Sequence, residues 1–250
     1  MDLKIKDKTA LVTGASAGIG RAIARGLAAE GVRVGIAARR GELLEQLAGE
    51  IVAAGGHAPT IVIVDVMDED APQRLAREAL NGLGQINILV NSAGAAKPLP
   101  NGTPEEKWVA SMTLNFTRIR QLTEAVLPGM IERKWGRVIN ITGKSEQPHL
   151  SPAHSAKAGV HIWSHGLSKD IARHGVTLNC IAPGRIMSEQ IRRNYSAEER
   201  ARQSAHDIPV GRFGEPEELA NLAVFLASPL AGYITGTVMP VDGGMRHYAF

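Results

Sequence analysis

Cysteine and long apolar runs are the scarcest features of this 250-residue sequence. Its one cysteine, Cys180, leaves no internal disulfide to form, which is typical of proteins from a reducing compartment. The apolar neighbours of Cys180 favour a buried strand thiol over a reactive nucleophile. No apolar run is long enough to span a membrane, and residues 1–6 lack the apolar segment of a secretory signal. We therefore expect a soluble cytoplasmic protein that has no membrane partner.

Strong charge of either sign is missing as well. The chain carries 28 lysines and arginines against 25 aspartates and glutamates, which gives a formal net charge of +3. The basic residues are scattered, and their one cluster, within residues 192–202, is interleaved with glutamates, as on a solvated helix face. We therefore expect no nucleic-acid partner.

Glycines gather in the stretch 13–20, between an apolar strand at 8–12 and a helix at 21–30, and a second strand follows at 32–37. Gly14, Gly18 and Gly20 allow the backbone to turn tightly and to approach a pyrophosphate closely. The N–H groups at the start of the helix then stabilise the phosphate charge. A strand, a glycine turn and a helix in this order predict a dinucleotide-binding site.

Strands and helices alternate along the rest of the chain. Further strands are expected at 60–66, 86–90, 136–142 and 176–181, with helices at 42–54, 69–81, about 104–133 and 153–173. The tail adds a helix and a seventh strand. No linker rich in proline, glycine or serine interrupts this alternation. The pattern predicts an α/β fold in which residues 1–250 form a single doubly wound (Rossmann-type) domain, with a parallel sheet of about seven strands and helices on both faces.

The residues after the second strand bear on the choice of cofactor. An acid in this region would bind the ribose hydroxyls of NAD, but the sequence has Arg39 and Arg40 instead. Their guanidinium groups are suited to a ribose phosphate, which favours NADP(H). The alternative is a pair of surface arginines that cap the next turn.

The spacing T-G-x-x-x-G-I-G resembles the signature of the short-chain dehydrogenase/reductase family. Further family landmarks follow in the expected order over nearly the whole chain, and they include the turns at 91–94 and 182–184 and the tail motifs within 209–244. The chain is most similar to the 3-oxoacyl-acyl-carrier-protein reductase branch. This resemblance implies an NADP(H)-dependent oxidoreductase that interconverts a ketone, in this branch a 3-oxoacyl group, and an alcohol. It also implies a homotetramer built through the two long helices, and residues 187–206 are expected to form a substrate lid.

The resemblance also implies cofactor contacts along most of the chain. Asp65 would contact the adenine amino group, although an aspartate here can instead cap the helix from Glu69. The residues from Ile186 to Ser188 would contact the nicotinamide carboxamide. The predicted cofactor-binding residues are Gly14, Ser16, Gly18, Ile19, Gly20, Arg39, Arg40, Asp65, Val66, Asn91, Ala93, Gly94, Lys157, Pro183, Gly184, Ile186 and Ser188.

A carbonyl reductase must supply a proton to the oxygen as hydride reaches the carbon. In the family, a tyrosine four residues before a lysine provides it, a serine after the fifth strand orients the carbonyl, and an asparagine on the long helix holds a water. Asn115 and Lys157 match, but Ala153 stands where the tyrosine is expected. The serine position falls near Thr142 or Gly143, in a segment about three residues shorter than usual in the family.

Two nearby residues are candidates for the missing proton donor. Lys144 follows the fifth strand and can polarise a carbonyl, while His154 adjoins the empty position and titrates near neutral pH. Each also has an ordinary interpretation. Lys144 can be a solvated loop lysine, and His154 can be a helix N-terminal residue. The predicted catalytic residues are Asn115, Lys157, Thr142, Lys144 and His154. The alternative function is a catalytically degenerate NADP-binding sensor or partner subunit.

Two further features of the sequence bear on the site. Tyr195, in the expected lid, can in principle fold back over the site. His161 and His165 have a spacing that would let them share a metal, but no acidic residue accompanies them in a metalloprotease pattern. We expect no metal and interpret this helix face as packed or intersubunit.

Overall fold

The structure, a computed structural model, describes residues 1–96, 99–143 and 150–246. In this part of the chain, one parallel sheet has the strand order β3-β2-β1-β4-β5-β6-β7, and the order reverses between β1 and β4. The prediction of a doubly wound parallel sheet is confirmed. Its strands are β1 (Thr9–Thr13), β2 (Arg33–Ala38), β3 (Thr60–Ile63), β4 (Ile88–Asn91), β5 (Gly136–Ile141), β6 (Val176–Pro183) and β7 (Val238–Val241).

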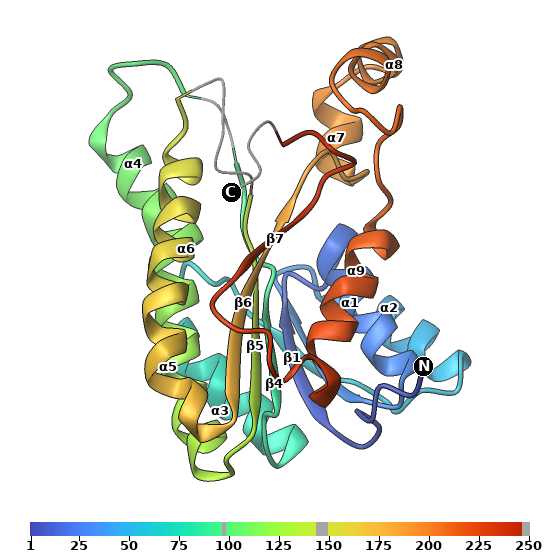
Figure 1. The fold of residues 1–250 in the computed structure, drawn as a ribbon, viewed down its shortest axis with the longest axis vertical. Coiled ribbons are helices and arrows are strands. Elements are labelled where there is room, and N and C mark those ends of the chain that lie inside the picture. Colours follow the sequence, from blue (N-terminus) through green and yellow to red (C-terminus); the bar gives the residue numbers. More distant parts are fainter. Residues whose placement is uncertain (97–98, 144–149, 247–250) are drawn as a thin grey trace.

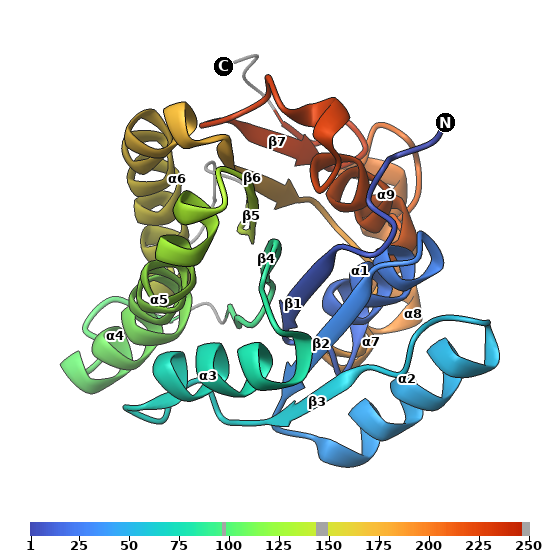
Figure 2. The same cartoon turned by 90° about the horizontal axis from the view of Figure 1, so that it is seen from below.

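Helices cover both faces of the sheet (Figures 1 and 2). One face carries α1 (Gly18–Ala29), α2 (Gly41–Ala53) and α9 (Pro216–Leu226). The other carries α3 (Ala71–Leu83), α4 (Glu105–Met112), α5 (Arg118–Glu132) and α6 (Pro152–Ile171). Two short helices, α7 (Glu189–Asn194) and α8 (Ala197–His206), follow β6 and stand beyond the carboxyl end of that strand (Figure 1). No helix within the described residues is long and apolar enough to cross a membrane.

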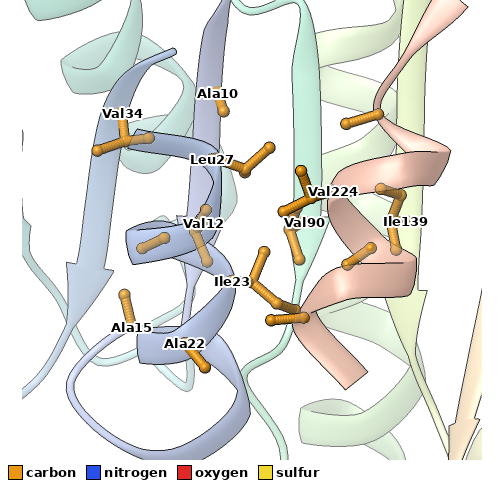
Figure 3. Packing of buried hydrophobic residues seen from close by; sticks show 14 of the residues in the cluster. Ala10, Val12, Ala15, Ala22, Ile23, Leu27, Val34, Val90, Ile139 and Val224 are labelled. Carbon is orange, nitrogen blue, oxygen red and sulfur yellow. The ribbon is translucent and has the colours of Figure 1, made fainter. Parts of the chain in front are cut away.

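The sheet is buried on both faces because its central strands are almost continuously apolar. On one face, Ile23 and Leu27 of α1 pack with Val12 and Val90 of the sheet and with Val224 of α9 (Figure 3). Burying a side chain of this size stabilises the fold by roughly 1.5–3 kcal/mol. A second cluster fills the space between the sheet and the helices α3, α5 and α6. The two clusters hold the carboxyl ends of the strands in fixed positions.

Several observed bounds differ from the prediction. The strand expected at 60–66 ends at Ile63, and the helix expected from Glu69 begins at Ala71. Pro72 explains the later start, because proline is tolerated in the first turn of a helix but not in its interior. The single helix expected at about 104–133 is divided by a π-helical turn, Thr113–Thr117. This turn contains Asn115.

Candidate functional site

The turn between β1 and α1 is closed by glycines. Gly14 has a φ of +67°, and a Cβ at this position would lie 2.9 Å from the backbone of Ala93, in the loop after β4. A Cβ at Gly20 would overlap the carbonyl oxygen of Gly14. The loops after β1 and β4 therefore lie against each other and present bare backbone at the switch point of the sheet, where doubly wound folds bind ligands.

The first turn of α1 opens onto this backbone surface. The first N–H groups of a helix have no intrahelical acceptor, and the N-cap residue, Ala17, has no side chain that could accept from them. Ile19 packs into the core beneath the turn, and a Cβ at Gly18 would lie 3.7 Å from Cβ of Ser188, which begins α7. The N-terminus of α1 favours an anion at this surface.

Arg39 and Arg40 lie at the carboxyl end of β2, and each has an acidic partner. Nη1 of Arg40 donates to Oε2 of Glu189 at 3.0 Å, and its Nη2 donates to Oγ of Ser16 in the glycine turn at 3.3 Å. Nη1 of Arg39 lies 3.6 Å from Oδ2 of Asp65. Arg40 is also the N-cap residue of α2, as the alternative expects, but its side chain makes no cap hydrogen bond.

Asp65 lies two residues beyond the end of β3. Its Oδ1 accepts a hydrogen bond of 2.9 Å from the backbone N–H of Met67, so it stabilises the turn after β3. The N-cap residue of α3 is Asp70. The alternative interpretation of Asp65 as the cap of the following helix is therefore wrong, because the helix starts too far along the chain.

The loop after β4 is fixed by buried polar side chains. Nδ2 of Asn91 donates to Oδ1 of Asn140 at 2.8 Å and to Oγ1 of Thr123 at 3.2 Å. The backbone N–H groups of Ser92 and Ala93 donate to Oγ1 of Thr13. Asn91 thus joins β4 to β5 and α5, and Thr13 joins the loop to β1. A pocket beside this loop is lined by Thr13, Val66, Ala71, Pro72, Leu75, Asn91, Ala93, Leu114, Arg118, Ile119 and Leu122.

Asn115 lies in the π turn and is 1 % exposed. Its Oδ1 accepts from the N–H of Ala95 at 3.2 Å, and its Nδ2 donates to the carbonyl oxygens of Ala95 and Ser111, both at 3.0 Å. A Cβ at Gly94 would lie 3.0 Å from Oδ1 of Asn115. The amide therefore satisfies backbone groups that the π turn and the β4 loop leave open, which explains an asparagine inside a helical segment.

Lys157 projects from α6 toward the end of β5. Its Nζ donates to the carbonyl oxygen of Thr142 at 3.0 Å. A Cβ at Gly143 would lie 3.4 Å from Cδ of Lys157, and one at Gly94 would lie 4.0 Å from its Cε. Burial lowers the pKa of Lys157 to about 8, because the ammonium loses hydration. The loop after β4, the end of β5 and α6 thus meet around one cation.

Thr142 also binds His161, one helical turn beyond Lys157. Oγ1 of Thr142 donates to the carbonyl oxygen of Ile181 at 3.1 Å, so its single proton is used there. Nε2 of His161 lies 2.8 Å from Oγ1 of Thr142, and with the hydroxyl proton directed to Ile181 we assign Nε2 as the donor. Burial lowers the pKa of His161 to about 4, and the positive charges of Arg246 and Lys157 add to this effect. The ring is neutral at neutral pH.

The sequence indicates no such role for His161, because its pattern suggests only a pairing with His165. Nδ1 of His165, one helical turn further along α6, lies 3.2 Å from the carbonyl oxygen of Gly236, so the two histidines have different partners. The useful signal was the spacing of four residues between Lys157 and His161, which puts both on one helix face. Their shared partner, Thr142, could be found only from the structure.

The position of the missing tyrosine lies in the first turn of α6. Ala153 is 2 % exposed there, and Ser151 is the N-cap residue. His154 is partly buried, and its backbone N–H donates to the carbonyl oxygen of Ser151 at 3.0 Å. Lys144 lies outside the described residues. Of the predicted catalytic residues, the structure brings Asn115, Thr142 and Lys157 together, and it places His154 beside Ala153.

The segment after β6 closes the site on its other side. The N–H of Gly184 donates to the carbonyl oxygen of Val241, and a Cβ at Gly184 would lie 2.6 Å from Asp242. Ile186 is buried and forms a parallel bridge with Gly214. Pro183, the last residue of β6, leads into this turn. Glycine is needed at 184 because the chain passes directly against β7.

Tyr195, between α7 and α8, is engaged at the base of these helices. Its hydroxyl oxygen accepts from Nη1 of Arg185 at 3.2 Å, and the guanidinium of Arg185 lies 5.2 Å from its ring centroid. This contact keeps the phenol with the segment after β6.

Known proteins resemble this chain over almost its whole length. A family described as enoyl-(acyl carrier protein) reductase matches residues 14–246. Among curated proteins, the 3-oxoacyl-(acyl-carrier-protein) reductase of Aquifex aeolicus is 36% identical over 98% of this chain and 100% of its own length. The corresponding reductase of Synechocystis is 39% identical over 95% of this chain and 96% of its own length.

Solved structures show the same fold. A 7α-hydroxysteroid dehydrogenase complexed with NADH and 7-oxo glycochenodeoxycholic acid superposes with a TM-score of 0.92 at 30% identity, covering 97% of this chain and 96% of its own. An actinorhodin polyketide ketoreductase with NADPH has a TM-score of 0.90 at 32% identity, covering 97% of this chain and 98% of its own. The architecture is thus shared over almost the whole length.

Proposed function

The chain belongs to the short-chain dehydrogenase/reductase family, and from this premise we propose that it is an NADP(H)-dependent reductase that interconverts a ketone and an alcohol. The observation that carries the proposal is the bare-backbone surface at the glycine turn, where the start of α1 lies open to a diphosphate. The reductase names of the curated relatives and the ketoreductase among the solved structures favour a keto substrate, such as a 3-oxoacyl group.

The residues present fit a phosphorylated dinucleotide. The diphosphate would lie over Gly14, Gly18 and Gly20, where any side chain would clash with backbone or narrow the gap toward Ser188. The adenine would lie beside Val66, Asn91 and Ala93, at the mouth of the pocket that they line. The guanidinium groups of Arg39 and Arg40 would take the 2′-phosphate. We propose that the remaining contacts come from Ser16, Ile19, Asp65, Gly94, Lys157, Pro183, Gly184, Ile186 and Ser188.

When bound, this cofactor supplies or accepts a hydride at its nicotinamide. The role of the protein is to bind and orient the cofactor and the substrate and to protonate the substrate oxygen. Lys157 would hold the ribose beside Asn115, while Thr142 would fix the lysine through its carbonyl oxygen. We propose that Lys144 or His154 gives the substrate oxygen the proton that Ala153 cannot give, and that residues 187–206, which contain α7 and α8, form the substrate lid.

The experiment follows NADPH absorbance with a panel of ketones, aldehydes and 3-oxoacyl thioesters. We expect turnover with at least one keto substrate. Lys144→Ala and His154→Ala are compared with His165→Ala as a matched control, and loss of turnover in one of the first two identifies the donor. Tight NADPH binding with no turnover across the panel would contradict the enzyme and favour a catalytically degenerate sensor or partner subunit, the function that Ala153 favours.

We also propose a homotetramer assembled through α4, α5 and α6. These helices carry large apolar side chains at the surface, since Val109 is 55% exposed and Ile162 is 78% exposed. Light scattering on the purified protein should give four times the chain mass, and a monomer would contradict the proposal.

A further inference from the structure

We propose that Glu189 is a specificity-determining residue of the cofactor site, because its carboxylate competes with the 2′-phosphate of the cofactor for the guanidinium of Arg40. The inference rests on the proposed function, since it takes Arg40 as a ligand of that phosphate. It adds Glu189, from the segment expected to form the lid, to the cofactor-binding residues that the sequence predicts.

The contacts of Arg40 define the competition. Nη1 donates to Glu189 at 3.0 Å, and Nη2 donates to Ser16 at 3.3 Å. An arginine binds a phosphate most strongly through two neighbouring N–H groups. The contacts with Glu189 and Ser16 use one N–H of each terminal nitrogen, so a phosphate that binds across Nη1 and Nη2 competes with both acceptors. Ser16 can remain, because its hydroxyl can rotate and donate to the phosphate. Glu189 cannot, because an ionised carboxylate only accepts.

The local charges determine whether Glu189 strengthens or weakens phosphate binding. Arg39 and Arg40 supply two positive charges, and Asp65 and Glu189 supply two negative charges, so the group as found is neutral. A 2′-phosphate brings nearly two further negative charges and is repelled by each carboxylate. Removing the charge of Glu189 would leave the group with one net positive charge, which favours the phosphate.

Glu189 is the acid that can give way. Asp65 is held by the hydrogen bond from the N–H of Met67, close to β3. The side chain of Glu189 is 63 % exposed on the first turn of α7 and contacts Arg40 across the gap between α7 and the end of β2. Ser188 caps α7 by accepting from the N–H of Ile191 and stands opposite Gly18. A cofactor without the 2′-phosphate leaves the pair of Arg40 and Glu189 in place.

The test measures the binding of two probes that differ only in this phosphate, 2′,5′-ADP and 5′-AMP, by calorimetry. In Glu189→Gln, the affinity for 2′,5′-ADP should rise about three- to tenfold, because one exposed charge repels a dianion at close range. The affinity for 5′-AMP should not change. The gain should shrink at high salt and should vanish in an Arg40→Gln background. The matched control is Glu198→Gln, an exposed glutamate of α8, and it should change neither affinity.

The possible outcomes are distinguishable. A wild-type preference for 2′,5′-ADP that Glu189→Gln leaves unchanged or weakens would overturn the role of Glu189 and leave the proposed function standing. An equal gain for both probes would also overturn it, because the effect would then not depend on the phosphate. If the wild type binds 2′,5′-ADP no better than 5′-AMP, the NADP(H) preference fails, and the inference fails with it.

Discussion

His161 makes the stability of the protein depend on pH in a way that can be calculated. Its pKa is about 4 in the folded chain, against 6.5 for an unperturbed histidine. Between these values, the unfolded chain binds a proton that the folded chain does not, so the free energy of unfolding rises with pH in this interval. The contribution is fully present above the unfolded pKa and is lost as pH falls. Lowering the pH from about 7.5 to about 5 should therefore cost about 2 kcal/mol at this residue.

The assay compares urea unfolding of the wild type and His161→Gln at both pH values. Glutamine keeps an N–H that can reach Oγ1 of Thr142 and does not titrate, so the variant should lose about 2 kcal/mol less than the wild type over this interval. Carboxylates contribute equally to both proteins and cancel. His165→Gln, on the exposed side of the same helix, should behave as the wild type does. Equal losses in the wild type and in His161→Gln would refute the neutral, donating imidazole.

Three further substitutions test other parts of the site. Gly20→Ala should weaken NADPH binding at least about tenfold, because its Cβ would overlap the carbonyl oxygen of Gly14, and intact binding would contradict the account. The control is Gly49→Ala in α2, where no atom lies within 4 Å of the added Cβ, and it should stabilise the fold by roughly 0.5–1 kcal/mol. Lys157→Met should raise the free energy of unfolding at neutral pH by about 1–2 kcal/mol, because it removes a buried charge. Cofactor affinity and turnover should fall in the same variant. A lower free energy of unfolding would contradict this prediction. Asn115→Ala should destabilise the fold by about 1–3 kcal/mol in urea unfolding, because buried backbone groups of Ala95 lose their partners, and an unchanged midpoint would count against that network.

The fold could be predicted from the sequence because the local signals agree with one another. Each apolar strand run is followed by an amphipathic helix, and a parallel sheet covered on both faces requires that order. The errors occur where a tertiary contact or a single residue overrides the pattern. Pro72 moves the start of α3, and the hydrogen bonds of Asn115 stabilise a π turn inside a segment that reads as one helix.

The candidate site was predictable in part. The glycines of the turn could be identified from the sequence, because their spacing follows from the close approach of two backbone segments. The partners of the charged side chains could not be identified in this way. The pair of Arg40 and Glu189 joins residues 149 positions apart, and no periodicity in either segment indicates that they meet. The contact between Thr142 and His161 was hidden for a similar reason, since it depends on how α6 lies against β5.

The most direct test of the account is a fluorescence titration of the purified protein with NADPH and with NADH. The backbone surface at the glycine turn and the two arginines at the end of β2 predict saturable binding of both, with NADPH the tighter ligand. Failure of both nucleotides to bind would contradict the dinucleotide site on which the proposed function depends.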